Sequence, residues 1–251
     1  MDARDPFFIG WAAAPPRLRG FLAACAVGLL ALFGGVAYLV AATADDPGDG
    51  AFRFDWGTVS VTGVLEAAPY PMLHVTTSDR FPAGHTLMLT GVGKTGVQAG
   101  ADAMNGRLVT ATGVVLKRGD LDMLQVDGGP NGFVPAEGAA TRPEATPLGR
   151  WKLTGEICDG KCYAGAMRPG QGLAHRACAS LCLVGGVPPV FVATGAVEGS
   201  EFLMMGDASG GPVPDSIYDH IATLVEIEGE IDRRGGLLVF LIDAASIRTA
   251  R

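Results

Sequence analysis

Four cysteines and one histidine lie close together in the second half of the sequence, with the spacing C-x3-C followed by H-x2-C-x3-C. These residues are Cys158, Cys162, His175, Cys178 and Cys182. Thiols and imidazole rings can form disulfides, bind soft metal ions or carry out thiol-disulfide exchange. The cluster is therefore the candidate functional site of the chain.

The second half of this cluster has the spacing of a helix face. Residues 173–184 predict a short helix that ends at a Gly-Gly pair followed by two prolines. On such a helix His175, Cys178 and Cys182 stand at i, i+3 and i+7 and share one face. Cys158 and Cys162 follow a predicted strand in a loop that can fold over this face, so we expect all five side chains to converge.

The first interpretation of the cluster is structural. In an oxidising compartment four cysteines most often form two disulfides, each contributing about 2–4 kcal/mol to stability. A bridge between Cys178 and Cys182 would constrain only one helical turn. We therefore expect cross-links from Cys158 and Cys162 to the helix under this interpretation.

Two chemical interpretations remain open beside it. In a metal-binding or electron-transfer protein, a copper, zinc or iron ion could be held by the four cysteines and His175, because thiolate and imidazole ligands suit these metals. The spacing matches neither a C-x2-C zinc ribbon nor a C-x-x-C-H haem attachment site. The third interpretation is a thiol-disulfide oxidoreductase, in which Lys161 or His175 lowers the pKa of a neighbouring cysteine.

A long apolar stretch near the start of the chain predicts a membrane helix. No residue between Arg19 and Asp45 is charged, and a helix of this length can cross a hydrocarbon core about 30 Å thick. Arginines precede the stretch and aspartates follow it, which places the N-terminus in the cytoplasm. We expect a cytoplasmic segment at 1–19, a transmembrane helix at 20–44 and extracytoplasmic domains after it. A cleaved signal peptide is the alternative, because residues 42–44 have the small-x-small form of a cleavage site.

An internal repeat sets the expected architecture. Residues 108–127 align with residues 224–243 at an offset of 116, whereas Thr62-Gly63 aligns with Thr154-Gly155 at an offset of only 92. The second copy therefore contains about 24 additional residues after its first strand, and these include the cysteine cluster. Each copy reads as three strands, a short helical segment and a two-strand hairpin, the order of an OB-like β-barrel. We predict a mainly β protein with barrels at 51–134 and 150–251 and a linker at 135–149.

Two further features restrict the function. The segment Gly91-Val-Gly-Lys-Thr-Gly96 has the Gly-Lys-Thr of a phosphate-binding loop, but Met88 stands where that motif needs its first glycine. We therefore interpret it as a turn after a strand. The net charge of −7, with no basic cluster, argues against a nucleic-acid partner.

The cysteine segment also resembles an uncharacterised group of bacterial exported or membrane-anchored proteins. The resemblance rests on Gly155-Glu-Ile-Cys-Asp-Gly-Lys-Cys-Tyr-Ala-Gly-Ala-Met-Arg-Pro-Gly, on His175-Arg-Ala-Cys-Ala-Ser-Leu-Cys and on Gly185-Gly-Val-Pro-Pro. It covers mainly residues 150–192 and implies a location in the bacterial cell envelope. Taken with the predicted membrane helix and its flanking charges, this location leads us to expect a single-pass protein of the bacterial inner membrane with the barrels in the periplasm. The resemblance implies no activity. The leading hypothesis is an accessory protein that docks to a membrane or periplasmic redox enzyme or metalloenzyme complex.

Overall fold

The computed structural model describes residues 15–43 and 48–250. The chain divides into two compact units, residues 1–46 and residues 47–251. In the first unit, helix α1 (Pro16–Thr43) is apolar and exposed at nearly every described side chain. Its segment 16–40 is long and apolar enough to cross a membrane, as the sequence predicts. Most of the predicted segment 1–19 lies outside the described residues.

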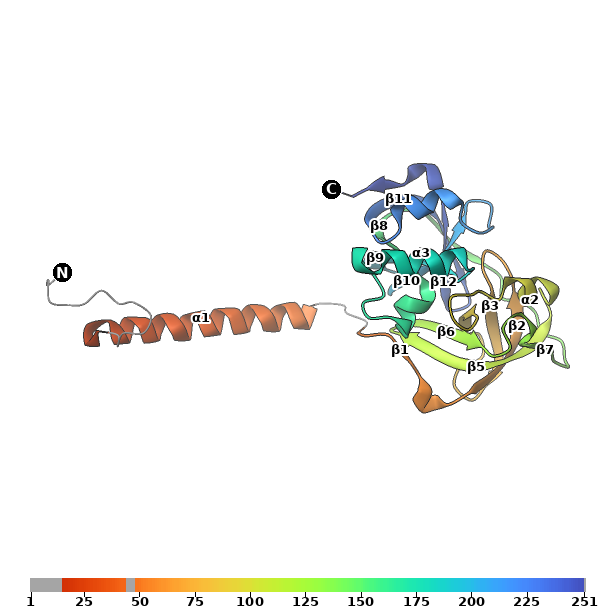
Figure 1. Cartoon of the computed structure of the whole chain (residues 1–251), viewed down its shortest axis with the longest axis horizontal. Coiled ribbons are helices and arrows are strands. Elements are labelled where there is room, and N and C mark those ends of the chain that lie inside the picture. The colour runs from red at the N-terminus through yellow and green to blue at the C-terminus, as the bar shows by residue number, and fades with distance from the viewer. Residues whose placement is uncertain (1–14, 44–47, 251) are drawn as a thin grey trace. The chain divides into compact units, whose positions relative to one another are not determined.

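The second unit contains two closed β-barrels of five strands each (Figure 1). The first barrel consists of β2 (Val59–Glu66), β3 (Met72–Ser78), β4 (Thr86–Thr90), β5 (Leu108–Arg118) and β6 (Leu121–Val126). The second barrel consists of β8 (Thr146–Asp159), β9 (Pro189–Val197), β10 (Ser200–Asp207), β11 (Leu224–Arg234) and β12 (Leu237–Ile242). In each barrel the first three strands are antiparallel neighbours, the third pairs in parallel with the fifth, and the fourth closes the barrel against the first. This is the OB-like connectivity that the repeat predicts.

Short elements complete the two barrels. Helix α2 (Gln98–Ala103) and the 3-10 segment η5 (Asp215–His220) each connect the third strand to the fourth. The short strands β1 (Ala51–Phe52) and β7 (Phe133–Pro135) pair with β5, and β13 (Arg248–Thr249) pairs with β11. Outside the connection between β8 and β9, the remaining 3-10 turns of the described residues are η1 (Phe54–Trp56), η2 (Gly129–Asn131) and η6 (Ala244–Ser246).

The offset of 116 residues is reproduced in the structure. Strands β5 and β11 begin and end at equivalent positions, as do β6 and β12. At the matching positions Gly113 and Gly229, a Cβ atom would overlap a backbone carbonyl oxygen of the neighbouring strand, so the close approach requires glycine. The additional residues of the second copy form the connection between β8 and β9. The predicted linker at 135–149 is shorter in the structure, because β8 begins at Thr146 and pairs there with the end of β11.

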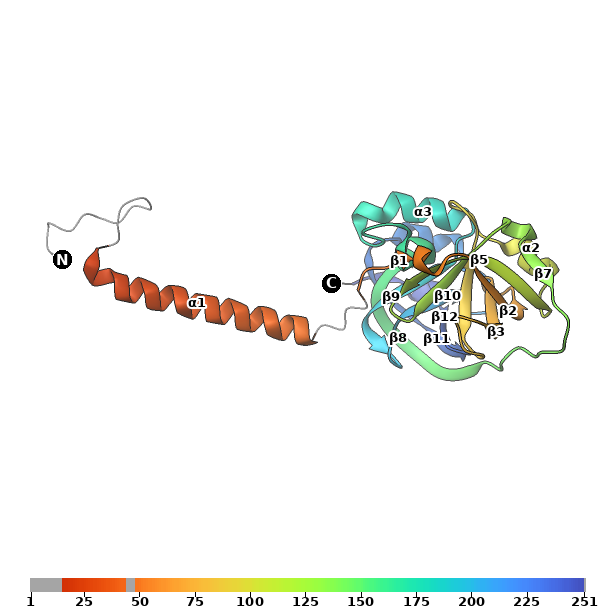
Figure 2. The same ribbon diagram turned by 90° about the horizontal axis from the view of Figure 1, so that it is seen from below.

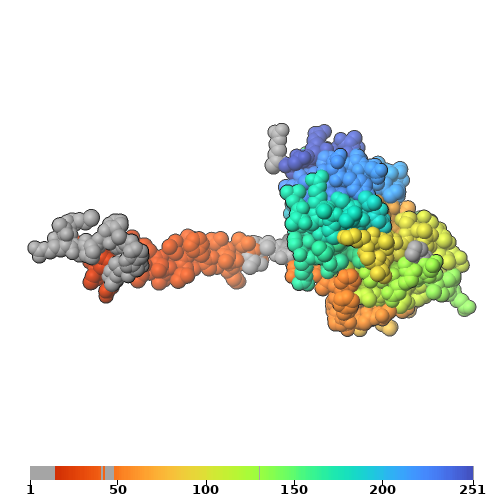
Figure 3. Space-filling model, viewed as in Figure 1, coloured from red at the N-terminus to blue at the C-terminus, as the bar shows by residue number. Residues whose placement is uncertain are grey.

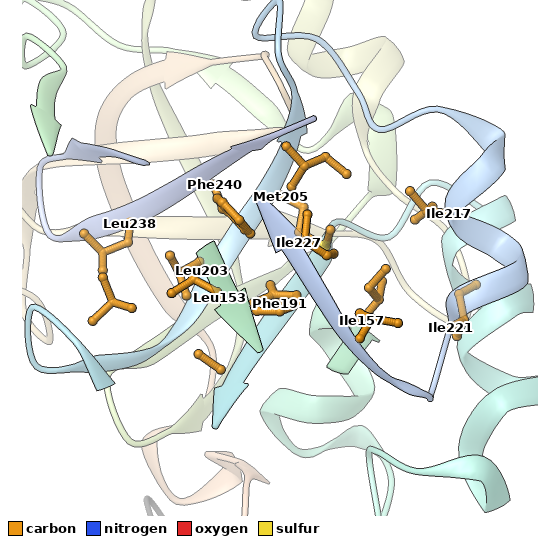
Figure 4. Packing of buried hydrophobic residues seen from close by; sticks show 14 of the residues in the cluster. Leu153, Ile157, Phe191, Leu203, Met205, Ile217, Ile221, Ile227, Leu238 and Phe240 are labelled. Atoms are coloured by element: carbon orange, nitrogen blue, oxygen red, sulfur yellow. The ribbon is translucent and has the colours of Figure 1, made fainter. Parts of the chain in front are cut away.

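Each barrel has its own apolar interior, and a third core joins them. The interior of the second barrel includes Phe191, Leu203, Met205 and Phe240 (Figure 4). Alternate side chains on the same strands point outward: Met204 lies between Leu203 and Met205 in the sequence but packs in the shared core. This explains why β4, β10 and β12 are apolar on both faces, since strands covered on both sides do not alternate with polar residues.

The shared core uses the outer faces of β3, β4 and β6 from the first barrel and of β9, β10 and β12 from the second. Its central residues are Met72, Met88, Met123, Phe202 and Met204, all buried. In OB-folds the face of the second and third strands commonly binds ligands. Here those two faces pack against each other at Met72, Met88, Val190 and Met204, which covers these parts of both faces.

A group of buried polar residues at one edge of the interface joins the two barrels. The Glu66 carboxylate of the first barrel accepts hydrogen bonds from Arg234 Nη1 of the second barrel at 2.8 Å and from His74 Nε2 at 2.7 Å. Arg142 Nη1 from the linker lies 3.2 Å from the same carboxylate. Burial acts to raise the pKa of Glu66, but the His74 hydrogen bond and the two arginines outweigh it and lower the pKa.

Candidate metal centre

The connection from β8 to β9 folds into a compact insertion on the outer surface of the barrels (Figure 2). It contains the π-type turn η3 (Cys162–Ala166), the 3-10 turn η4 (Leu173–His175) and helix α3 (Arg176–Val184). The predicted helix at 173–184 is confirmed, with a tighter first turn. It ends at Gly185, whose N–H bonds the Leu181 carbonyl.

Asp159, at the end of β8, organises the start of the insertion. One carboxylate oxygen accepts the backbone N–H of Cys162 at 2.8 Å, and the other lies 2.9 Å from His175 Nε2. Asp159, Cys162 and His175 are all buried, with potential ligand atoms within 4.8 Å of one another. A carboxylate that orients a histidine ring is a common partner of metal-binding histidines.

Three of the four clustered cysteines converge. Cys162 Sγ lies 3.8 Å from both Cys178 Sγ and Cys182 Sγ, and all three sulfur atoms are within 4.8 Å of one another. Cys162 and Cys182 are buried, whereas Cys178 is half-buried. Metal–sulfur bonds of about 2.3 Å in a tetrahedral site place the sulfur atoms about 3.8 Å apart. The spacing therefore suits three thiolates around one ion.

The fourth cysteine lies elsewhere. The Cys158 thiol donates to Glu156 Oε1 at 3.2 Å, and its side chain packs in the core between the two barrels. It belongs to neither of the two potential ligand groups. The reason is local: Cys158 is still in β8, so its direction is set by the strand and not by the insertion.

The predicted cross-links from Cys158 and Cys162 to the helix are not formed in this structure. All five cysteines of the chain lie in the described residues, and each carries a free thiol. Cys25 is exposed on α1, in the other unit.

Cys162 and Cys182 are not electrostatically equivalent. A hydrogen bond from Cys162 lowers the pKa of Cys182, with a further contribution from Lys94, against the opposing effect of burial. The same hydrogen bond, together with burial, raises the pKa of Cys162. Burial raises the pKa of Cys158 well above its usual value, which makes that thiol unreactive. Cys182 therefore loses its proton more readily than Cys162.

The cation beside these thiols is Lys94, which the spacing of the cysteines did not indicate. Lys94 Nζ, in the loop after β4, lies 2.6 Å from Cys178 Sγ and 3.5 Å from Cys182 Sγ. Lys161, the predicted neighbour, instead donates to the backbone carbonyls of Gly91 and Gly93 at 2.6 and 2.8 Å. The segment 91–96 is indeed a turn after a strand. The glycines and the lysine of this segment marked it in the sequence as a possible site. Only the packing of the two barrels brings the segment to the cysteines.

No family model, curated protein or solved structure matches this chain.

Proposed function

We propose that this chain is a membrane-anchored, extracytoplasmic metal-binding protein in which Cys162, Cys178 and Cys182 hold one soft metal ion. The observation that carries the proposal is the convergence of three sulfur atoms at the spacing of ligands to a common ion. Zinc, Cu(I) and iron all accept thiolate ligands. His175, held by Asp159 through Nε2, lies within 4.8 Å of Cys162 but in a separate group from Cys178 and Cys182, so its ring would have to move toward them to supply a fourth ligand.

The proposed location rests on α1 and its flanks. The helix exposes an apolar surface of membrane-spanning length, and Arg17 and Arg19 lie at its start. Cationic residues are retained on the cytoplasmic side, so the barrels and the thiol cluster would lie in the periplasm of a bacterium, anchored to the inner membrane.

The experiment uses the full chain purified in detergent without a metal-affinity step. Elemental analysis gives the metal content, and thiol titration under denaturing conditions counts the free cysteines after a chelator has removed the ion. We expect one ion per chain and five titratable thiols. No metal and two disulfides would refute the proposal in favour of a structural role, whereas no metal and one readily reduced pair would favour thiol-disulfide exchange.

A second function, docking to a partner protein, is favoured by the exposed apolar side chains of the insertion. Leu173, Leu181 and Val184 are 61–72% exposed, and Val92 in the adjacent loop is 59% exposed. Clustered exposed apolar residues mark interaction sites more often than scattered ones do. Replacing Leu181 and Val184 by serine should abolish co-purification of a membrane complex while leaving metal content unchanged, and retention of the complex would refute docking through this surface.

A further inference from the structure

The loop that carries Lys94 is attached to the cysteine insertion at both of its ends. Near its start, the ammonium group of Lys161, which is 3% exposed, donates to the carbonyls of Gly91 and Gly93. At its other end, the Gly96 N–H donates to the Gly185 carbonyl at 2.8 Å. The loop belongs to the first barrel and the insertion to the second, so these hydrogen bonds hold together two segments that are distant in the sequence.

Glycine is required where the two segments meet. A Cβ atom at Gly185 would overlap the Lys94 carbonyl oxygen, and one at Gly96 would overlap the Gly186 carbonyl oxygen. This backbone contact is closer than any larger residue permits. It brings the surface of the loop directly against that of the insertion, where the two border each other in Figure 3.

This packing fixes the position of the positive charge of Lys94. Lys94 is exposed, yet its ammonium group is directed at the two helix cysteines and reaches the half-buried side of the cluster, next to Cys178. Three thiolates around a divalent ion leave one net negative charge, which a single ammonium group neutralises. An ionised donor also forms a stronger hydrogen bond than a neutral one.

We propose, on the basis of the metal site argued above, that Lys94 is a positioning residue of that site. Its ammonium group donates to the thiolates of Cys178 and Cys182 without binding the ion, so that the first barrel closes the accessible side of a centre whose ligands all come from the second. The loop 91–96 thereby controls how readily the ion leaves.

The test compares Lys94→Gln, Lys94→Arg and the matched control Lys152→Gln in the full chain. Lys152 is an exposed lysine of β8 paired with Glu226, so its replacement removes the same charge away from the insertion. Each protein is loaded with Co²⁺, whose thiolate charge-transfer absorption reports the sulfur ligands, and with Zn²⁺, whose transfer to a chelator gives affinity and release rate. Loss of a group that hydrogen-bonds to a ligand typically lowers metal affinity about 10- to 100-fold.

We expect Lys94→Gln to bind one Co²⁺ with unchanged charge-transfer intensity, to shift that absorption to lower energy and to release Zn²⁺ at least about tenfold faster. The shift follows because loss of an N–H donor raises the energy of the sulfur lone pairs. Lys94→Arg should restore most of the affinity and Lys152→Gln should match the wild type.

Two results would overturn the inference alone. One is a Lys94→Gln protein with the absorption and release rate of the wild type. The other is loss of stoichiometric binding that Lys94→Arg does not restore, which would make Lys94 a ligand. Failure of the wild-type chain to bind either ion would instead refute the proposed function, and this inference with it.

Discussion

Cys162 and Cys158 form a matched pair that isolates the metal site from the rest of the fold. The two residues are four positions apart and are 3% and 1% exposed, so a serine at either position places a hydroxyl in a buried site. Only Cys162 has its sulfur 3.8 Å from two other thiols. Cys162→Ser should therefore remove metal binding, and Cys158→Ser should not.

The size of the effect follows from the number of ligands. Structural zinc sites with four ligands contribute about 10–16 kcal/mol, or about 2.5–4 kcal/mol for each ligand. Because about 1.4 kcal/mol corresponds to a factor of ten, Cys162→Ser should weaken Zn²⁺ binding by about 100- to 1000-fold. Cys158→Ser keeps a donor for Glu156 and should cost only about 1 kcal/mol of folding stability.

Competition with a chromophoric zinc chelator measures the affinities, and urea unfolding of the metal-free proteins measures stability. At a free zinc concentration of about 100 times its Kd, the wild type should gain about 2.7 kcal/mol in unfolding free energy. Cys158→Ser should show the same gain and Cys162→Ser almost none. The reasoning is refuted if both variants lose affinity equally, or if Cys162→Ser binds zinc as tightly as the wild type.

Three other predictions concern the contacts between the barrels. Gly185→Ala should separate the loop 91–96 from the insertion and accelerate zinc release as Lys94→Gln does. The control Gly195→Ala, at a position with open space around it, should leave the release rate unchanged. Equal release rates of the two variants in chelator competition would contradict this prediction. Arg234→Met should lower the free energy of unfolding in urea by about 3–5 kcal/mol, because it leaves the Glu66 carboxylate buried without one of its cations. A loss below about 1 kcal/mol would be inconsistent with a buried ion pair. The pKa of Glu66 is lowered in the folded state, so its contribution to stability is present above pH 4.5 and is lost as the pH falls through the folded pKa. Urea unfolding between about pH 6 and pH 3 should therefore show a shallower acid loss in Glu66→Gln than in the wild type, and parallel curves would argue against this assignment.

The repeat made the barrels predictable from the sequence. Hairpins at equivalent positions, with turn glycines at 119 and 235, indicated strands whose pairing is local along the chain. The apolar stretch of α1 needed only its length and composition, and the helix at 173–184 needed only its apolar residues and the glycines that end it. These features depend on neighbours in sequence, which is why a pattern can reveal them.

The membership of the site could be predicted only in part. The i, i+3, i+7 spacing correctly brought Cys178 and Cys182 to one face, and the turn after β8 brought Cys162 over it. The direction of Cys158 depends on which face of β8 meets the other barrel, and a single strand does not reveal this. Both faces of the strand are apolar, so only the packing of the two barrels decides which face lies between them.

The sequence alone determined the order of the main barrel strands in each copy, the membrane-length helix and the place of the cysteine insertion, because each follows from local periodicity or from the repeat. Only the tertiary structure decided that the two OB-like faces cover each other and that Lys94 lies beside Cys178, 84 residues further along the chain. The physical reason is that close packing between the barrels depends on the shapes of both surfaces at once. That information is not carried by the spacing of residues within either copy.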